Sequence, residues 1–234
     1  MAAITNCGSQ PALAGRPLWW RWTLATATGE LLGFAVPASA GPLAVRILSR
    51  LPTAPRALAL VPLVALAGVV EGAALGFAQW LVLRRAIRGM AAREWVLPTA
   101  LAAGIAYILG MTPSTLADLG AGTTAMIGAW ILLGPLLLVS LGTAQWLSLR
   151  RYVPGAGWWL GAWAAAWMAG LALPFVGLAL VPDGSPVAAF IVAGVVSGWL
   201  MGAVVGAVSG LALVRLLRSV TSHLSGTCPG WHDG

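Results

Sequence analysis

Charged residues are scarce in this chain of 234 residues, where they make up 8% of the composition and hydrophobic residues make up 59%. A soluble domain usually carries about 25% charged residues, so too little charge exists here to cover a water-facing surface. The apolar runs are instead long enough to cross a bilayer, which takes about 20 residues per helix. The composition therefore excludes an ordinary soluble domain and predicts a single integral membrane domain.

Lysine is absent, and all 13 basic residues are arginines, which leave a net charge of +7. A basic balance can indicate a nucleic-acid partner. Here the arginines flank apolar segments, so we expect them to orient the chain and to contact anionic lipid headgroups instead. The bias toward arginine and alanine is typical of a GC-rich bacterial genome, and we expect a bacterial plasma-membrane protein that binds no nucleic acid.

Cysteine and histidine occur only twice each, and neither lies inside an apolar segment. Cys7 and Cys228 lie in the two tails, which excludes a disulfide framework and predicts reduced thiols if both tails are cytosolic. Without a histidine in the membrane, an intramembrane Ser-His dyad is excluded. The motifs HExxH, GxSxG and the P-loop are also missing. We therefore expect a protein that is not an enzyme and that holds no metal or cofactor.

Six apolar segments predict an all-α fold, a polytopic transmembrane bundle of about six spans over residues 18–218. The polar tails, 1–17 and 219–234, are expected to be disordered. Residues 38–40, Ala-Ser-Ala, also resemble a signal-peptidase site, and cleavage there would leave five spans. Glu30 inside the first segment and the repeat described below favour six. The segments are at about 18–40, 57–83, 95–117, 123–149, 158–181 and 187–217.

The arginines gather at one end of a six-span bundle. The loops at the other end, after the third and fifth segments, carry Asp118 and Asp183 and no arginine. By the positive-inside rule, the arginine-rich end and both termini are expected to be cytoplasmic. Residues 42–56 do not fit the positive-inside rule, because they place three arginines at the non-cytoplasmic end. We expect them to form a short amphipathic piece in the membrane interface. The arginines at the cytoplasmic end are Arg16, Arg21, Arg84, Arg85, Arg88, Arg93, Arg150, Arg151, Arg215 and Arg218, and the exceptions are Arg46, Arg50 and Arg56.

One decamer is written twice, as GFAQWLVLRR at residues 76–85 and as GTAQWLSLRR at 142–151, with eight of ten positions identical. A weaker copy, GAVSGLALVR, ends the sixth segment at 206–215 and has Ser209 in place of the glutamine. Tryptophans open the first, third and fifth segments. The simplest explanation is a helical hairpin of about 65 residues present three times in one orientation, which would give a pseudo-threefold bundle. These parallel hairpins would cover about 18–85, 95–151 and 158–218.

Glycine recurs at every fourth position in two segments. Such stripes of small residues let helix backbones approach closely. We expect them to pack helices within the chain, while packing against a second copy or another membrane protein stays open. The stripes are Gly68, Gly72 and Gly76 in the second segment, and Gly194, Gly198, Gly202, Gly206 and Gly210 in the sixth.

Two acids, Glu30 and Glu71, lie inside apolar segments. Counting from the flanking tryptophan and arginine places them about 15 and 20 Å into the membrane, near its middle. A charge there costs at least roughly 2.5–3.5 kcal/mol, and no cation lies within reach along the same helix. The pair is either a proton or cation site, or a pair of neutral carboxyls that fixes packing through hydrogen bonds. Gln79 and Gln145 lie nearer the arginines, where interhelical hydrogen bonds are expected of them.

The stretch EGAALGFAQWLVLRR, residues 71–85, precedes a tryptophan-led apolar helix. It resembles a family of small bacterial multi-pass membrane proteins whose hairpins end in a G-x-x-Q-W-L-x-L-R-like motif. The resemblance covers about residues 68–170 and the outer hairpins weakly, since the third copy lacks the Gln-Trp pair. It implies this architecture and no known chemistry.

Two functional classes follow. The first is a non-catalytic membrane subunit or scaffold that packs against a partner through the glycine stripes. The second is a component that binds or transports a small solute, a lipid, a proton or a cation, with Glu30 and Glu71 as its polar centre. Six short-looped helices with two carboxyls offer little machinery for alternating access, which favours the first class.

Overall fold

The computed structural model describes residues 14–225, and this part of the chain consists of helices joined by short turns, without a strand. Six of its helices are long and apolar enough to cross a membrane, which confirms the predicted all-α, multi-pass bundle. Cys7 and Cys228 lie outside the described residues. The helices are α1 (Gly15–Ile47), α2 (Thr53–Ala86), α3 (Ala92–Asp118), α4 (Thr123–Leu149), α5 (Trp159–Ala179) and α6 (Val187–Ser225), with 3₁₀ turns at Leu48–Arg50 and Ala156–Trp158.

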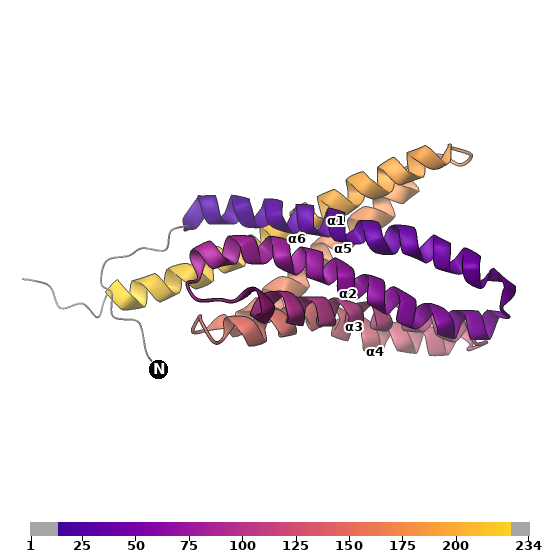
Figure 1. The fold of residues 1–234 in the computed structure, drawn as a ribbon, viewed down its shortest axis with the longest axis horizontal. Coiled ribbons are helices and arrows are strands. Elements are labelled where there is room, and N and C mark those ends of the chain that lie inside the picture. Colours follow the sequence, from indigo (N-terminus) through magenta and orange to yellow (C-terminus); the bar gives the residue numbers. More distant parts are fainter. Residues whose placement is uncertain (1–13, 226–234) are drawn as a thin grey trace, which may run out of the picture.

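The helices pack in the order of the chain, each against the next, and α6 returns to pack against α1. The ring is weakest between α4 and α5. Figure 1 shows α1 to α4 running along the length of the molecule, while the α5–α6 hairpin crosses at an angle and its turn lies apart from the other turns. The starts of α1, α3 and α5 and the ends of α2, α4 and α6 therefore share one end of the bundle, called here the arginine-rich end.

The link between α1 and α2 differs from the prediction. The interfacial amphipathic piece expected over residues 42–56 is absent, because α1 continues to Ile47 and α2 already begins at Thr53. A helix of 33 or 34 residues is about 50 Å long, well beyond the ~30 Å hydrocarbon core. Arg46, Arg50 and Arg56 therefore lie on helix ends that can project past the apolar layer.

Helix α6 also runs further than expected, to Ser225 rather than to about residue 218. Residues 219–225 contain neither glycine nor proline, so the chain offers nothing to end the helix before Gly226. Four of the turns between the long helices do use a glycine with a positive φ angle, which other residues rarely adopt. They are Gly89, Gly120, Gly155 and Gly184, with φ angles of 83°, 85°, 72° and 78°.

The glycines of the two stripes fall into two groups. Gly68, Gly72 and Gly76 face α3, and Gly202, Gly206 and Gly210 face α1. A Cβ atom on Gly72 would lie 2.5 Å from the Cβ of Ala103 and 2.9 Å from the Cα of Ala100. By contrast, a Cβ atom on Gly194 or Gly198 would meet no atom within 4 Å. Six of the eight stripe glycines are thus occupied by contacts inside this chain.

These contacts predict that Gly72→Ala destabilises the bundle although it improves helix propensity. The added methyl group overlaps both the backbone and a side chain of α3, and such overpacking usually costs about 1–3 kcal/mol. The free energy of unfolding in an SDS titration measures the effect. Gly134→Ala on α4 is the matched control, because its Cβ would meet nothing within 4 Å. Equal stability of the two variants would contradict the close α2–α3 packing.

Candidate functional site

Three tryptophans meet at the arginine-rich end, and we call them the tryptophan triangle. Trp22 comes from α1, Trp95 from α3 and Trp159 from the start of α5, and all three are fully buried. Their rings contact one another edge to face, with centroids 5.9 to 6.4 Å apart. This geometry is the one that aromatic quadrupoles favour. The triangle therefore joins one helix of each hairpin at a common point.

Each indole N–H of the triangle donates a hydrogen bond to the same decamer position. Trp95 donates to Gln79 Oε1 (3.2 Å), Trp159 to Gln145 Oε1 (3.3 Å) and Trp22 to Ser209 Oγ (2.9 Å). Ser209 thus supplies in the weakest copy the acceptor that glutamine supplies in the other two. In a water-free interior, an indole donor without an acceptor would be costly.

The two glutamines also bond to each other. Gln145 Nε2 donates to Gln79 Oε1 (3.1 Å), and Gln79 Nε2 donates to Thr26 Oγ1 (3.3 Å). Both side chains are fully buried. Gln79 therefore ties α1, α2, α3 and α4 together, and neither amide has a face open to a ligand.

The first glycine of each decamer completes the packing. This glycine packs against a residue of the neighbouring helix that lies four positions after a tryptophan of the triangle. A Cβ atom added to Gly76 would lie 3.2 Å from the Cβ of Thr99. The corresponding distances are 3.1 Å from Gly142 to Trp163 and 3.0 Å from Gly206 to Thr26.

The arginines that end the first two decamers lie over their own tryptophans. The guanidinium of Arg84 lies 5.0 Å from the ring centre of Trp80, and that of Arg150 lies 4.9 Å from that of Trp146. Such cation–π pairs suit the interface, where the ring is shielded and the charge remains hydrated. These contacts occupy the glutamine, the tryptophan and the first arginine of both decamers in packing.

Loops at the same end are tied through Glu94. Its carboxylate accepts hydrogen bonds from the Tyr152 hydroxyl (2.5 Å) and the Ala91 N–H (3.0 Å), and it pairs with Arg151 at 3.9 Å. The bond to Glu94 raises the pKa of the Tyr152 phenol above its usual value. These contacts hold the α4–α5 connection against the start of α3.

A second polar cluster lies deeper in the bundle, and we call it the acidic centre. Glu30 of α1 and Glu71 of α2, 2% and 7% exposed, bring their carboxyl groups into hydrogen-bonding contact. Tyr107 of α3 donates its hydroxyl to Glu71 Oε2. Glu30 Oε1 has no hydrogen-bond partner. The structure therefore joins the two acids predicted from the sequence and adds a tyrosine to them.

Sequence reasoning missed Tyr107, although a signal was present. It is a tyrosine inside an apolar segment, twelve residues after Trp95, and hence about 18 Å deep. That depth matches those of Glu30 and Glu71. A buried phenol at the depth of two buried carboxyls is a natural hydrogen-bond partner for them.

Each member of the acidic centre lies against a glycine of a neighbouring helix. A Cβ atom added to Gly33 would lie 2.8 Å from the backbone oxygen of Glu71. A Cβ atom added to Gly202 would lie 2.9 Å from the Cβ of Glu30. A Cβ atom on Gly68 would overlap the ring of Tyr107. The glycines therefore provide the space that these three polar side chains fill.

In the part of the chain that the structure describes, no arginine pairs with a carboxyl of the acidic centre. The nearest arginine along α1 is Arg21, nine residues from Glu30 and hence about 13 Å away. Two carboxylates in contact repel each other, so the pair is stable only if at least one carboxyl is protonated or another cation is bound. Protons and cations are thus the species that this arrangement can hold.

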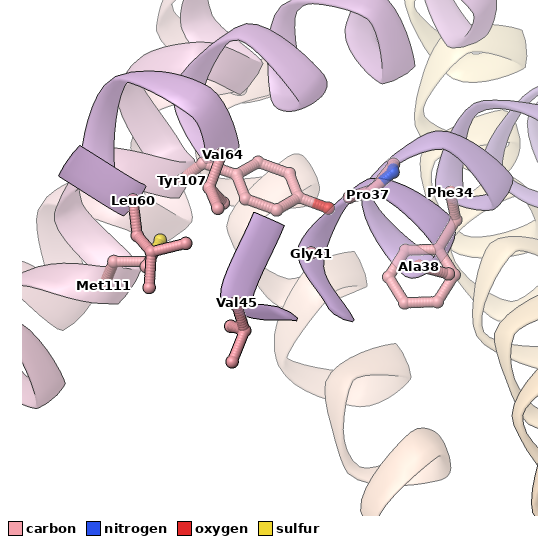
Figure 2. Close-up of a pocket in the computed structure, with 9 residues that line it drawn as sticks. All are labelled: Phe34, Pro37, Ala38, Gly41, Val45, Leu60, Val64, Tyr107 and Met111. Carbon is pink, nitrogen blue, oxygen red and sulfur yellow. The ribbon is translucent and has the colours of Figure 1, made fainter. Parts of the chain in front are cut away.

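An apolar groove of about 320 Å³ adjoins the acidic centre on the side away from the arginine-rich end, and we call it the outer groove. Figure 2 shows Tyr107 reaching across it, with its hydroxyl directed toward α1 near Pro37 and Gly41. Tyr107 therefore belongs to both features. The groove is lined by Phe34, Pro37, Ala38, Gly41 and Val45 of α1, Leu60 and Val64 of α2, and Tyr107 and Met111 of α3.

No protein-family model, curated protein or solved structure matches this chain.

The hydrogen bonds of Gln79 predict a large effect of Gln79→Leu, which keeps the volume and removes the polar atoms. The change leaves the Trp95 indole and the Gln145 amide without their acceptor, and each orphaned buried donor costs about 1–3 kcal/mol. We expect a loss of about 2–4 kcal/mol in the free energy of unfolding in an SDS titration.

The matched control for this variant is Phe77→Thr, which converts the first decamer toward the second at a half-exposed position. It should change the stability little. If Gln79→Leu were as stable as this control, the hydrogen bonds at the tryptophan triangle would not hold the bundle together.

Proposed function

We propose that this protein is a membrane component that binds or transports a proton or a small cationic solute at the acidic centre. The observation that carries the proposal is the unpartnered Glu30 Oε1, buried beside Glu71 without an arginine in contact. Ionisable groups at this depth are costly, and where they occur they usually lie on ion or substrate pathways.

The contrast with the arginine-rich end supports this interpretation over a role in packing alone. Gln79, Gln145 and Ser209 are as deeply buried as Glu30, and each has hydrogen-bond partners. A carboxyl that served only as interhelical glue would be expected to be equally satisfied. Instead an acceptor atom is kept free at the one place where two acids meet.

The residues of the acidic centre have separate parts in the proposed binding. Tyr107 donates to Glu71 and fixes that carboxyl. Glu30 offers the free oxygen, so a proton or cation between the two carboxyls would be held by α1 and α2 together. Because Gly33 of α1 lies directly against Glu71, a small shift of α1 along α2 would separate the carboxyls and release the bound species.

A non-catalytic scaffold is the second candidate. Most of the stripe glycines contact helices of this same chain, but Gly194 and Gly198 of α6 are open, and large apolar residues around them are exposed. A helix of another membrane protein or of a second copy could pack there. This function needs only the outer half of α6 and makes no use of the acidic centre.

Native mass spectrometry of the gently extracted protein separates the two candidates. For a binding component, we expect a small cationic molecule to co-purify with the native chain and to be lost in Glu71→Gln and Glu30→Gln. Glu94→Gln is the control, because that carboxyl lies at the arginine-rich end. A protein partner or an oligomer retained equally in all variants, with no small molecule, would contradict binding of a small cationic solute at the acidic centre and favour the scaffold.

A further inference from the structure

The outer groove and the acidic centre lie on the same faces of the helices. On α1, the groove residues Phe34, Pro37, Ala38 and Gly41 follow Glu30 by 4, 7, 8 and 11 positions, which is the spacing of one helix face. On α2, Val64 and Leu60 precede Glu71 by 7 and 11 positions in the same way. The groove and the two carboxyls therefore share one face of α1 and one face of α2, and Tyr107, which lines the groove and donates to Glu71, connects them.

Resting on the function proposed above, we propose that the acidic centre and the outer groove form one site for a lipophilic amine. The protonated amine lies between Glu30 and Glu71, and its apolar body fills the groove. The occupant is a molecule that is cationic at one end and hydrocarbon elsewhere.

The chemistry of the lining selects this class over an inorganic cation. Apart from the Tyr107 hydroxyl, every side chain that lines the groove is apolar. A hydrated metal ion that entered this way would lose its water without replacement, since hard cations need several oxygen ligands. A hydrocarbon body, by contrast, can move from the lipid into the groove without a desolvation cost, because both are apolar. The groove volume of about 320 Å³ is at the small end for ligand sites.

The acceptors at the inner end match an ammonium group. A primary ammonium carries three N–H donors and no acceptor. Glu30 Oε1 has no partner, and the other carboxyl oxygens and the Tyr107 oxygen have lone pairs to spare. An alcohol of the same shape would donate once and bring no charge, so the two carboxyls would still need their proton.

The depth of the acidic centre excludes a phospholipid amine as the ligand. Glu30 and Glu71 lie about 15–20 Å from the arginine-rich end, near the bilayer middle, whereas phospholipid headgroups lie at the surface. The ligand must carry its amine into the membrane on its own apolar body.

Binding exchanges one cation for another. The amine arrives with its proton, and the proton that the two carboxyls had shared leaves for the solvent. One proton is therefore released for each amine bound, and the net charge of the site does not change. No covalent bond is made or broken.

The test uses the full-length protein in phosphatidylcholine nanodiscs, with radiolabelled dodecylamine as the probe and empty nanodiscs as the blank. We expect saturable binding of one dodecylamine per protein with release of one proton. Dodecanol should show no saturable binding, and methylamine should bind at least tenfold more weakly because it leaves the groove empty.

Two pairs of variants separate the two ends of the site. Glu71→Gln should weaken dodecylamine binding at least tenfold by removing one charge from the ammonium partner. Gly41→Leu should weaken it similarly by filling the groove, and it should fold, because a Cβ at Gly41 meets nothing within 4 Å. Gly134→Leu on α4, where a Cβ is equally free, is its control, and Glu94→Gln is the control for the acid.

The outcomes distinguish this inference from the function on which it rests. If methylamine bound as tightly as dodecylamine, and Glu71→Gln but not Gly41→Leu weakened binding, the groove would be overturned and the cation site would stand. If dodecanol bound as tightly as dodecylamine, the groove would be an ordinary lipid contact and the inference would be overturned.

If no amine bound saturably and no proton was released, the inference would fail, and binding at the acidic centre would then rest on the co-purification result alone. Loss of binding on adding phosphatidylethanolamine would show that a headgroup amine reaches the site, contrary to the depth argument.

Discussion

The need to give every buried polar group a partner in a water-free interior governs this bundle. At the arginine-rich end the need is met by the tryptophan triangle, where three indole N–H groups find acceptors on Gln79, Gln145 and Ser209. Each of these bonds joins one helix to its neighbour in the ring. Because the rings also pack against one another, a single cluster fixes the starts of α1, α3 and α5.

The acidic centre departs from that rule, as do the indole N–H groups of Trp163 and Trp167, which are also buried without a partner. The surroundings of the acidic centre show how its departure is accommodated. Glycines 33, 68 and 202 leave room for Glu71, Tyr107 and Glu30, so the stripes that look like plain packing motifs also shape the polar site. Arg21, the nearest arginine along α1, lies about 13 Å from Glu30. A pair of acids held together in this way needs a proton or another cation, and this need connects the packing of the helices to the binding function that we propose.

Much of this architecture could be predicted from the sequence because lipid imposes simple rules. The apolar runs predicted six helices, and the repeated decamer identified the equivalent positions that meet at the tryptophan triangle. Other features depended on tertiary contacts that no local pattern encodes. The role of Ser209 as the third acceptor was not apparent, because serine replaces glutamine and its partner, Trp22, lies 187 residues away. Tyr107 was missed because no spacing on α3 indicates that it faces Glu71. The three arginines of residues 42–56 predicted a piece in the membrane interface. Helices as long as α1 and α2 can instead carry these arginines beyond the apolar layer.

In the binding function that we propose, Glu30 and Glu71 share a proton that a cation can replace. Infrared difference spectroscopy of the protein in nanodiscs, with and without dodecylamine, tests it most directly. The carbonyl band of a protonated carboxyl should be present in the free protein and should be converted to carboxylate bands when the amine binds. In Glu71→Gln this band should be absent or shifted. A protonated-carboxyl band that persists unchanged at saturating amine would contradict the claim and would make the acidic centre a fixed packing element of the bundle.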